Sequence, residues 1–154
     1  MHKHGERTVK NYAKAIIGLS LLGTLNALYL TSLFVHNKWG APASSVCDIN
    51  STVSCSNVIA SPYALFLGVP VCSIALVVYP ILIWLGLAAL RREKTRDLFY
   101  AASILSALGL MLNVVYIYNE IVHIGAICIL CFGCTVLIAL DLLASIRGYR
   151  LSTD

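Results

Sequence analysis

The chain has 154 residues, of which 59% are hydrophobic and 12% charged, with a mean hydropathy of +0.84 and a net charge of +4. Such an apolar composition excludes an ordinary soluble domain of this length and indicates an integral membrane protein with one compact domain over residues 1–154. The positive charge does not indicate nucleic-acid binding, because the basic residues form short clusters beside apolar runs, where they set membrane orientation.

The first apolar run predicts a transmembrane helix over about residues 13–35, after a polar and basic lead-in. At about 1.5 Å per residue, this length crosses a hydrocarbon layer of about 30 Å. The run is too long for a signal-peptide core and no small-residue cleavage site follows it, so we expect it to remain as a helix. Asn26, in the middle of the run, is interpreted as an interhelical hydrogen-bonding residue.

A polar outer loop is predicted over residues 36–69, and it carries Cys47 and Cys55. Their eight-residue offset is not a helical repeat, but a flexible loop closes a disulfide of this spacing readily. Ser61 and Pro62 form a helix-start signature, with serine as the N-cap and proline at the first helical position. We therefore expect the loop to end in a short helix at the membrane surface.

Three further spans are predicted, over about residues 70–90, 98–119 and 126–146. A tight, strongly charged turn separates the first two of these spans. A short loop precedes the last span, and its residues Glu120 and His123 are interpreted as interfacial, with assistance to proton transfer as the alternative. The predicted fold class is an all-α integral membrane protein, a bundle of four transmembrane helices.

The distribution of basic residues predicts that both termini lie on the cytoplasmic side of the cell membrane. Four lysines and arginines precede the first span and four lie in the turn after the second, whereas the long loop has one and the third connection has none. The cysteines of the loop and of the last span then share the outer, oxidising side, where disulfides persist. They are Cys47, Cys55, Cys128 and Cys131.

Cys128 and Cys131 stand three residues apart at the head of the last apolar run. On a helix these positions share one face, so they can close a disulfide across a single turn. The partial positive charge of a helix N-terminus stabilises a thiolate at Cys128. Two dithiol pairs, one on a mobile loop and one beneath it, are what a thiol–disulfide relay needs. A lipid-soluble quinone is the natural electron acceptor, and Cys131, one turn deeper, is where its ring could meet a thiolate.

Other interpretations of the cysteines remain open. The protein could be non-catalytic, with structural disulfides or with zinc bound by thiolates, although the spacing of the two loop cysteines is not that of a zinc knuckle. Cys72 and Cys134 are interpreted as packing residues, but Cys134 follows Cys131 by three positions and forms a second candidate Cys-x-x-Cys pair. Tyr116 and Tyr118 are interpreted as part of an interfacial aromatic belt.

These motifs resemble those of the vitamin K epoxide reductase family of membrane thiol oxidoreductases, in particular its prokaryotic members. Cys47-Asp48, five intervening residues, then Ser54-Cys55 and later Ser61 are similar to the family's loop motif. The Cys128-Ile-Leu-Cys131 stretch is similar to the active-site pair. The motifs occur in the family's order, and the similar span pattern covers nearly the whole chain.

The resemblance implies a role for each of these residues. Cys128 and Cys131 would form the active-site disulfide, with Cys131 next to a quinone of the menaquinone or ubiquinone type. Cys55 would attack Cys128, and Cys47 would exchange with a thioredoxin-fold (DsbA-like) protein outside the membrane. Ser61 would contribute its hydroxyl near the quinone pocket. The implied function is quinone-dependent oxidation of that partner, which then introduces disulfides into exported proteins.

Some features depart from the family pattern. Animal members have a tyrosine four residues after the second active-site cysteine, where this chain has Thr135, and no asparagine early in the second span matches their other polar quinone contact. We therefore do not expect epoxide reduction. Many bacterial relatives carry a fused thioredoxin-like domain, and this chain ends too soon to contain one, so we expect the partner to be a separate protein.

Overall fold

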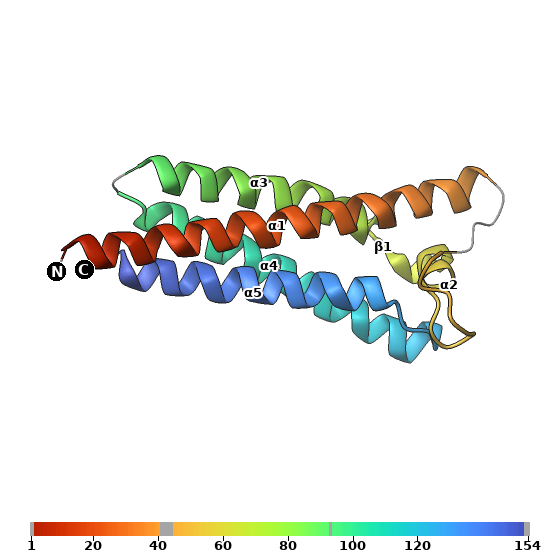
Figure 1. Cartoon of the computed structure of the whole chain (residues 1–154). Coiled ribbons are helices and arrows are strands. Elements are labelled where there is room, and N and C mark those ends of the chain that lie inside the picture. The colour runs from red at the N-terminus through yellow and green to blue at the C-terminus, as the bar shows by residue number, and fades with distance from the viewer. Residues whose placement is uncertain (1, 41–44, 93, 153–154) are drawn as a thin grey trace.

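Four long helices form the body of the computed structural model, which describes residues 2–40, 45–92 and 94–152 (Figure 1). They are α1 (His2–Trp39), α3 (Val71–Arg91), α4 (Arg96–Asn119) and α5 (Ile129–Leu151). Each is long and apolar enough to cross a membrane. The predicted all-α bundle of four membrane helices is confirmed.

The helices extend beyond the predicted spans, most of all in α1. This helix begins at His2, so the residues expected to form an interfacial lead-in are part of one continuous helix. α1 packs along α3 and α5, and α4 packs along α5 and α3. α1 begins and α5 ends at the same end of the bundle, and the long loop lies at the other end (Figure 1). An even number of crossings produces this arrangement.

Short elements close the loop end of the bundle. They are α2 (Cys55–Ala60), the 3-10 turn η1 (Pro62–Ala64), and a hairpin of β1 (Leu65–Phe66) and β2 (Val69–Pro70). The Ser61 hydroxyl accepts a hydrogen bond from the Tyr63 amide at 3.3 Å, which confirms the predicted N-cap. The helix that it starts is a single turn, because Leu67 and Gly68 have positive φ values of 53° and 82° and reverse the chain into β2.

Two polar side chains of α1 are paired with α5 inside the bundle. Asn26 donates to the Leu130 carbonyl at 2.8 Å and to the Cys134 sulfur at 3.1 Å, which confirms its interhelical role. Ser20 donates to the Asp141 carboxylate at 3.0 Å, and both residues are fully buried. These bonds join α1 to α5 at two levels and fix their relative positions.

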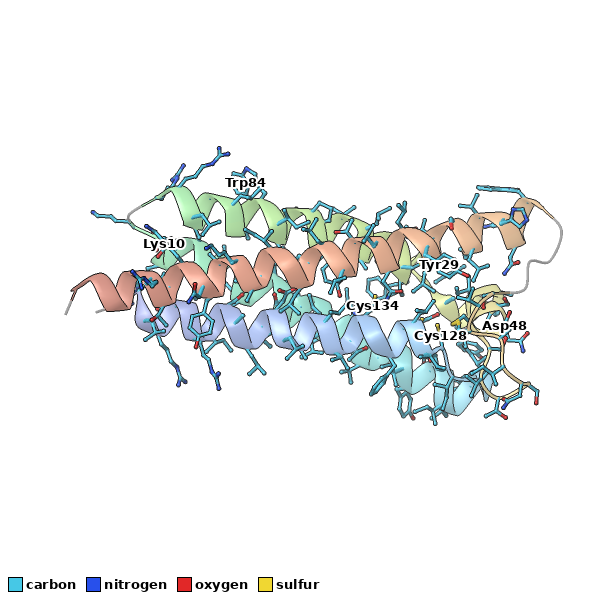
Figure 2. The ribbon with its side chains drawn as sticks, viewed as in Figure 1. Lys10, Tyr29, Asp48, Trp84, Cys128 and Cys134 are labelled. Carbon is cyan, nitrogen blue, oxygen red and sulfur yellow. A yellow bond between two sulfur atoms is a disulfide. The ribbon has the colours of Figure 1, made fainter. Side chains whose placement is uncertain are left out.

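Large apolar side chains cover the outer surface of the helices, as expected where lipid replaces water. Trp84, labelled in Figure 2, is 63% exposed, and Leu25 and Met111 are exposed to a similar degree. The interior holds two apolar clusters, one toward the termini and one beneath the loop. The second cluster contains four of the six cysteines and is where the candidate site lies.

Candidate functional site

The loop cysteines, Cys47 and Cys55, are joined in a disulfide with their Cα atoms 5.7 Å apart. Cys55 is the first residue of α2, whose N-cap Ser54 accepts a hydrogen bond from the Asn57 amide at 3.2 Å. Both half-cystines are buried, Cys55 completely and Cys47 with 6% of its surface exposed. A partner can therefore reach this disulfide only where the loop moves or is displaced.

Cys128 lies directly against this disulfide. Its sulfur is 2.9 Å from the sulfur of Cys55, and Figure 2 shows it beside the loop that carries Asp48. Cys128 is the N-cap of α5, and its sulfur accepts a hydrogen bond from the Cys131 amide at 3.3 Å. Cys128 and Cys131 are free thiols here, one turn apart. The helix thus starts at the Cys-x-x-Cys motif, and the first of its thiols contacts the loop.

A parallel β-bridge between Val53 and Ile127 fixes this contact. The Ser54 amide donates to the Ile127 carbonyl at 3.2 Å, and the Ile127 amide donates to the Thr52 carbonyl at 2.7 Å. Val53 is two positions from Cys55 and Ile127 is next to Cys128, so the backbone pairing places these two cysteines opposite each other.

Asp48 organises the loop around the disulfide. Its carboxylate accepts from the hydroxyls of Ser54 and Ser56, at 2.8 and 2.6 Å, and from the amides of Ser45 and Ser56, at 2.6 and 3.1 Å. Partial burial alone would raise the pKa of Asp48, but these donors together hold the pKa well below its usual value. The ionised carboxylate is therefore the form that this loop conformation binds.

The loop should loosen in acid. Because the pKa of Asp48 is lowered in the folded protein, its stabilisation is complete above the ordinary aspartate pKa of about 4 and is lost as the pH falls below it. We expect limited proteolysis of the loop to accelerate below that pH, and Asp48→Asn to show the faster cleavage already at neutral pH. If Asp48→Asn is cleaved slowly at neutral pH and its cleavage accelerates in acid as in the wild type, this role of Asp48 is contradicted.

A buried glutamate adjoins the thiol pair. Residues 120–125 are not the predicted loop, because α4 continues into a π-helical turn, η2 (Glu120–Ile124), which ends at Gly125 with a φ of 69°. Glu120 is 1% exposed, and its Oε2 atom accepts a hydrogen bond from the Cys128 amide at 3.0 Å. The interfacial interpretation of Glu120 was therefore wrong. His123 is exposed and stacks on Tyr63, with ring centroids 4.8 Å apart.

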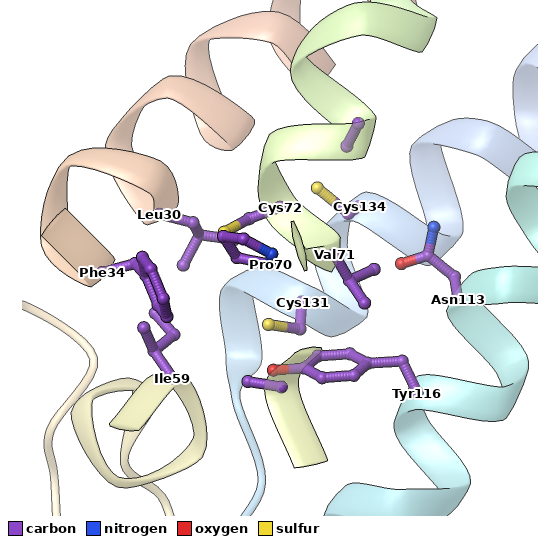
Figure 3. Close-up of a pocket in the computed structure, with 12 residues that line it drawn as sticks. Leu30, Phe34, Ile59, Pro70, Val71, Cys72, Asn113, Tyr116, Cys131 and Cys134 are labelled. Carbon is purple, nitrogen blue, oxygen red and sulfur yellow. The ribbon is translucent and has the colours of Figure 1, made fainter. Parts of the chain in front are cut away.

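A pocket of about 410 Å³, including its open mouth, lies next to Cys131 (Figure 3). Its walls come from all four long helices and the loop elements, and they are mostly apolar: Leu30, Phe34, Ile59, Ala64, Pro70, Val71, Cys72, Ala75, Asn113, Tyr116, Cys131 and Cys134. Apolar walls with a few convergent polar groups are typical of a site for a small, flat ligand. In Figure 3 the Tyr116 hydroxyl and the Cys131 sulfur point the same way.

The donor set of this pocket suits a quinone. Tyr116 offers a hydroxyl to carbonyl oxygens, and Asn113 offers the one amide hydrogen that it does not donate to the Gly109 carbonyl. A thiol at Cys131 offers a reducing group. Tyr116 is 6% exposed, so its interpretation as a belt residue was wrong. The spacing of three and four residues among Asn113, Tyr116 and Glu120 is typical of one helical face, but the spacing alone does not say whether that face lies toward the protein or toward its surroundings.

The remaining predicted site residue is Ser61. It is half-buried at the start of η1, between Ile59 and Ala64, which both line the pocket. Its hydroxyl is engaged with the Tyr63 amide. A direct contact between Ser61 and a ligand stays a prediction.

Three sulfur atoms, those of Cys47, Cys55 and Cys128, lie within 4.8 Å of one another. A metal site requires thiolates, and two of these sulfurs are bonded to each other in the disulfide. The cluster in this state is arranged for exchange between sulfur atoms. The carboxylates of Asp48 and Glu120 accept hydrogen bonds instead, from the Ser56 hydroxyl and the Cys128 amide.

Comparison with known proteins agrees with this geometry. The family model described as "Vitamin K epoxide reductase family" matches residues 14–146, which is most of the chain. A search of curated proteins gives no match. Members of the family are oxidoreductases that generally use quinones and thioredoxin-like redox partners. The matched residues include both cysteine pairs, all of α3 and α4 and most of α1 and α5, so the chain belongs to the vitamin K epoxide reductase family.

Proposed function

We propose that this protein is a quinone-dependent thiol oxidoreductase that oxidises a thioredoxin-fold partner outside the cell membrane. Electrons pass from Cys47 and Cys55 to Cys128 and Cys131, and then to quinone. The single observation that carries the proposal is the 2.9 Å separation of the Cys55 and Cys128 sulfurs, between two pairs that each can form a disulfide. Sulfur atoms that exchange must approach each other directly, and these two already do.

The partner reacts first, at Cys47. One partner thiolate attacks the Cys47 sulfur and displaces Cys55 as a thiolate, and the second partner thiolate then displaces Cys47. The partner leaves with a disulfide, and the loop is left with two reduced cysteines. The oxidised partner then introduces disulfides into exported proteins.

The loop then passes its electrons inward. The Cys55 thiolate attacks Cys128 of the oxidised pair, forms a Cys55–Cys128 disulfide and displaces Cys131 as a thiolate. Cys47 attacks Cys55, which restores the loop disulfide and releases Cys128. After this step the loop is oxidised and Cys128 and Cys131 are reduced; the same pairing of cysteines in the structure supports this order of exchange.

The pocket beside Cys131 is the proposed quinone site. A bound quinone supplies the acceptor for two electrons and two protons. Phe34 and Tyr116 would pack against its ring, and Asn113 and Tyr116 would bind its oxygens. Ser61 would contribute its hydroxyl at the edge of the pocket. The basic residues near the termini support an orientation in which both termini are cytoplasmic and the disulfide loop is outside.

The test is quinone reduction by the purified protein in detergent with a dithiol donor, in wild type, Cys131→Ser and Cys134→Ser. We expect turnover in wild type and in Cys134→Ser, and none in Cys131→Ser. The reason is that Cys131 lies one turn from Cys128, the cysteine that contacts the loop. Loss of turnover in both variants would instead favour Cys131 and Cys134 as the active pair, and turnover retained in Cys131→Ser would contradict the assignment of Cys131. A wild type inactive with both ubiquinone and menaquinone analogues would favour a structural disulfide or a metal site.

A further inference from the structure

The proposed electron path leaves Glu120 without a role, although its carboxyl group is the buried acid closest to the chemistry. Oε2 binds the Cys128 amide at 3.0 Å, and Oε1 has no hydrogen-bond partner among the described residues. Cys131 is one turn along α5 from Cys128, and its amide donates to the Cys128 sulfur at 3.3 Å, so the thiol pair adjoins this carboxyl group. A side chain with 1% exposure cannot satisfy its second oxygen from bulk water. Its environment therefore depends on the state of the thiols.

Formation of a disulfide changes what Glu120 can bind. In the reduced pair, Cys131 carries an S–H group that can turn toward the unpartnered Oε1 atom and support a negative charge on the carboxylate. In the Cys128–Cys131 disulfide this donor no longer exists, and a buried carboxylate that loses a donor is favoured to take up a proton. The backbone bond from Cys128 holds the carboxyl group in place in both states.

We propose that Glu120 exchanges protons with the Cys128–Cys131 pair, as an ionised carboxylate beside the dithiol and as a neutral acid beside the disulfide. This inference rests on the proposed function, because it requires that the two cysteines form a redox pair. It adds a proton site to a path that so far carries only electrons. The π-helical turn η2 is the element that turns this side chain inward, and such turns occur often at functional sites.

The protons and electrons balance in both directions. Oxidation of the two thiols forms the S–S bond and releases two electrons and two protons; the electrons go to the quinone, one proton goes to Glu120, and the other leaves with the acceptor or to solvent. When Cys55 attacks Cys128, the S–S bond breaks, Cys131 leaves as a thiolate, and the neutral acid returns its proton to that sulfur. Over a full cycle Glu120 takes up one proton and returns it, so its net change is zero.

The other titratable groups that face Glu120 come from each element packed around it. They are Cys128 and Cys131 of α5 and Tyr116 of α4. The elements packed against η2 also carry Cys55 on α2 and Tyr63 on η1, and η2 itself carries His123. Cys55 does not titrate while the loop disulfide is closed. None of these groups offers a second carboxylate.

The number of protons taken up on reduction gives a direct test. A redox titration of the Cys128/Cys131 couple at several pH values, read by thiol alkylation and mass, needs no quinone. For a two-electron couple each proton taken from solvent changes the equilibrium tenfold per pH unit, or about 30 mV. In wild type, Glu120 supplies one of the two thiol protons, so we expect a slope of about 30 mV per pH unit, and in Glu120→Gln about 60 mV.

The titration is made with Cys47→Ser and Cys55→Ser in every protein, so that only the inner pair responds. Asp141→Asn is the matched control, since Asp141 is an equally buried carboxyl that is bonded to Ser20 and lies away from the pair. It should keep the wild-type slope. As a second readout, the infrared difference between oxidised and reduced protein should contain the carbonyl band of a protonated acid, and Glu120→Gln should remove it.

Each outcome is decisive. A wild-type slope of about 60 mV per pH unit, or an infrared difference without the acid band, would overturn the inference even if Glu120→Gln fails to fold. A slope that is unchanged in Glu120→Gln would leave Glu120 as a support for the Cys128 backbone. Failure of Cys128 and Cys131 to form any disulfide in the titration would instead overturn the proposed function.

Discussion

Replacement of Cys128 by serine should lower dithiol-dependent quinone reduction by roughly a thousandfold or more, on the scale that follows loss of a catalytic nucleophile. Cys128 is the residue that joins the two pairs, because its sulfur contacts Cys55 on one side and its amide and sulfur are tied to Glu120 and Cys131 on the other. A serine hydroxyl keeps the N-cap of α5 but cannot form a disulfide. Steady-state reduction of a quinone analogue measures the effect.

The same contact can be trapped covalently. In the double variant Cys47→Ser, Cys131→Ser, the sulfurs of Cys55 and Cys128 lose their usual partners and remain 2.9 Å apart. We expect mild oxidation to convert nearly all molecules to the Cys55–Cys128 disulfide, detected as one linked pair of peptides. Single Cys131→Ser protein is the control, since it keeps the loop disulfide and should leave Cys128 open to alkylation. Links from Cys55 to Cys72 or Cys134 in place of this pair would contradict the proposed path.

The second large effect concerns stability at Gly23. A Cβ atom at this position of α1 would overlap the ring of Tyr79, which is 1% exposed and donates its hydroxyl to the Cys134 carbonyl at 3.0 Å. The ring is held at both ends and cannot turn aside without loss of this bond. We expect Gly23→Ala to lower the free energy of unfolding by about 1–3 kcal/mol, the usual cost of an overpacked core, as measured by thermal unfolding in detergent.

Gly18→Ala provides the matched control on the same helix. Gly18 is exposed, and a Cβ atom there would meet no heavy atom within 4 Å. Alanine is favoured over glycine inside a helix by about 1 kcal/mol, so this variant should be at least as stable as wild type. Equal stability of the two variants would show that α1 and α3 are not packed closely at Gly23.

The thiol pair was predictable from sequence because its geometry is local. A Cys-x-x-Cys motif at the head of an apolar run fixes where a helix begins, and the structure places Cys128 at the N-cap of α5 with Cys131 one turn inside. Ser61 and Pro62 were predictable for the same reason, as a serine cap followed by proline. Asn26 needed only the rule that polar groups inside a membrane find partners on other helices.

Glu120 and Tyr116 were not predictable in the same way. Whether a glutamate near a helix end faces water or protein depends on how the chain winds there, and η2 adds a wider turn that no propensity indicates. The same uncertainty applies to Tyr116, because a tyrosine near the membrane surface suits an aromatic belt or a pocket equally well. Only the position of α5 across from α4 decides that it faces Cys131.

The backbone bridge between Val53 and Ile127 has a kinetic consequence. In the proposed cycle the inner exchange is a unimolecular step with a high effective concentration, because the bridge holds the sulfurs of Cys55 and Cys128 together; effective molarities of about 10⁵ M or more are known for well-oriented groups. The proposed encounter with an outer partner has no such advantage, and Cys47 is only 6% exposed. At low partner concentration the turnover rate of the proposed cycle is therefore proportional to the frequency of productive collisions with the partner. The reaction with the partner, and not electron transfer to the quinone, then limits the rate.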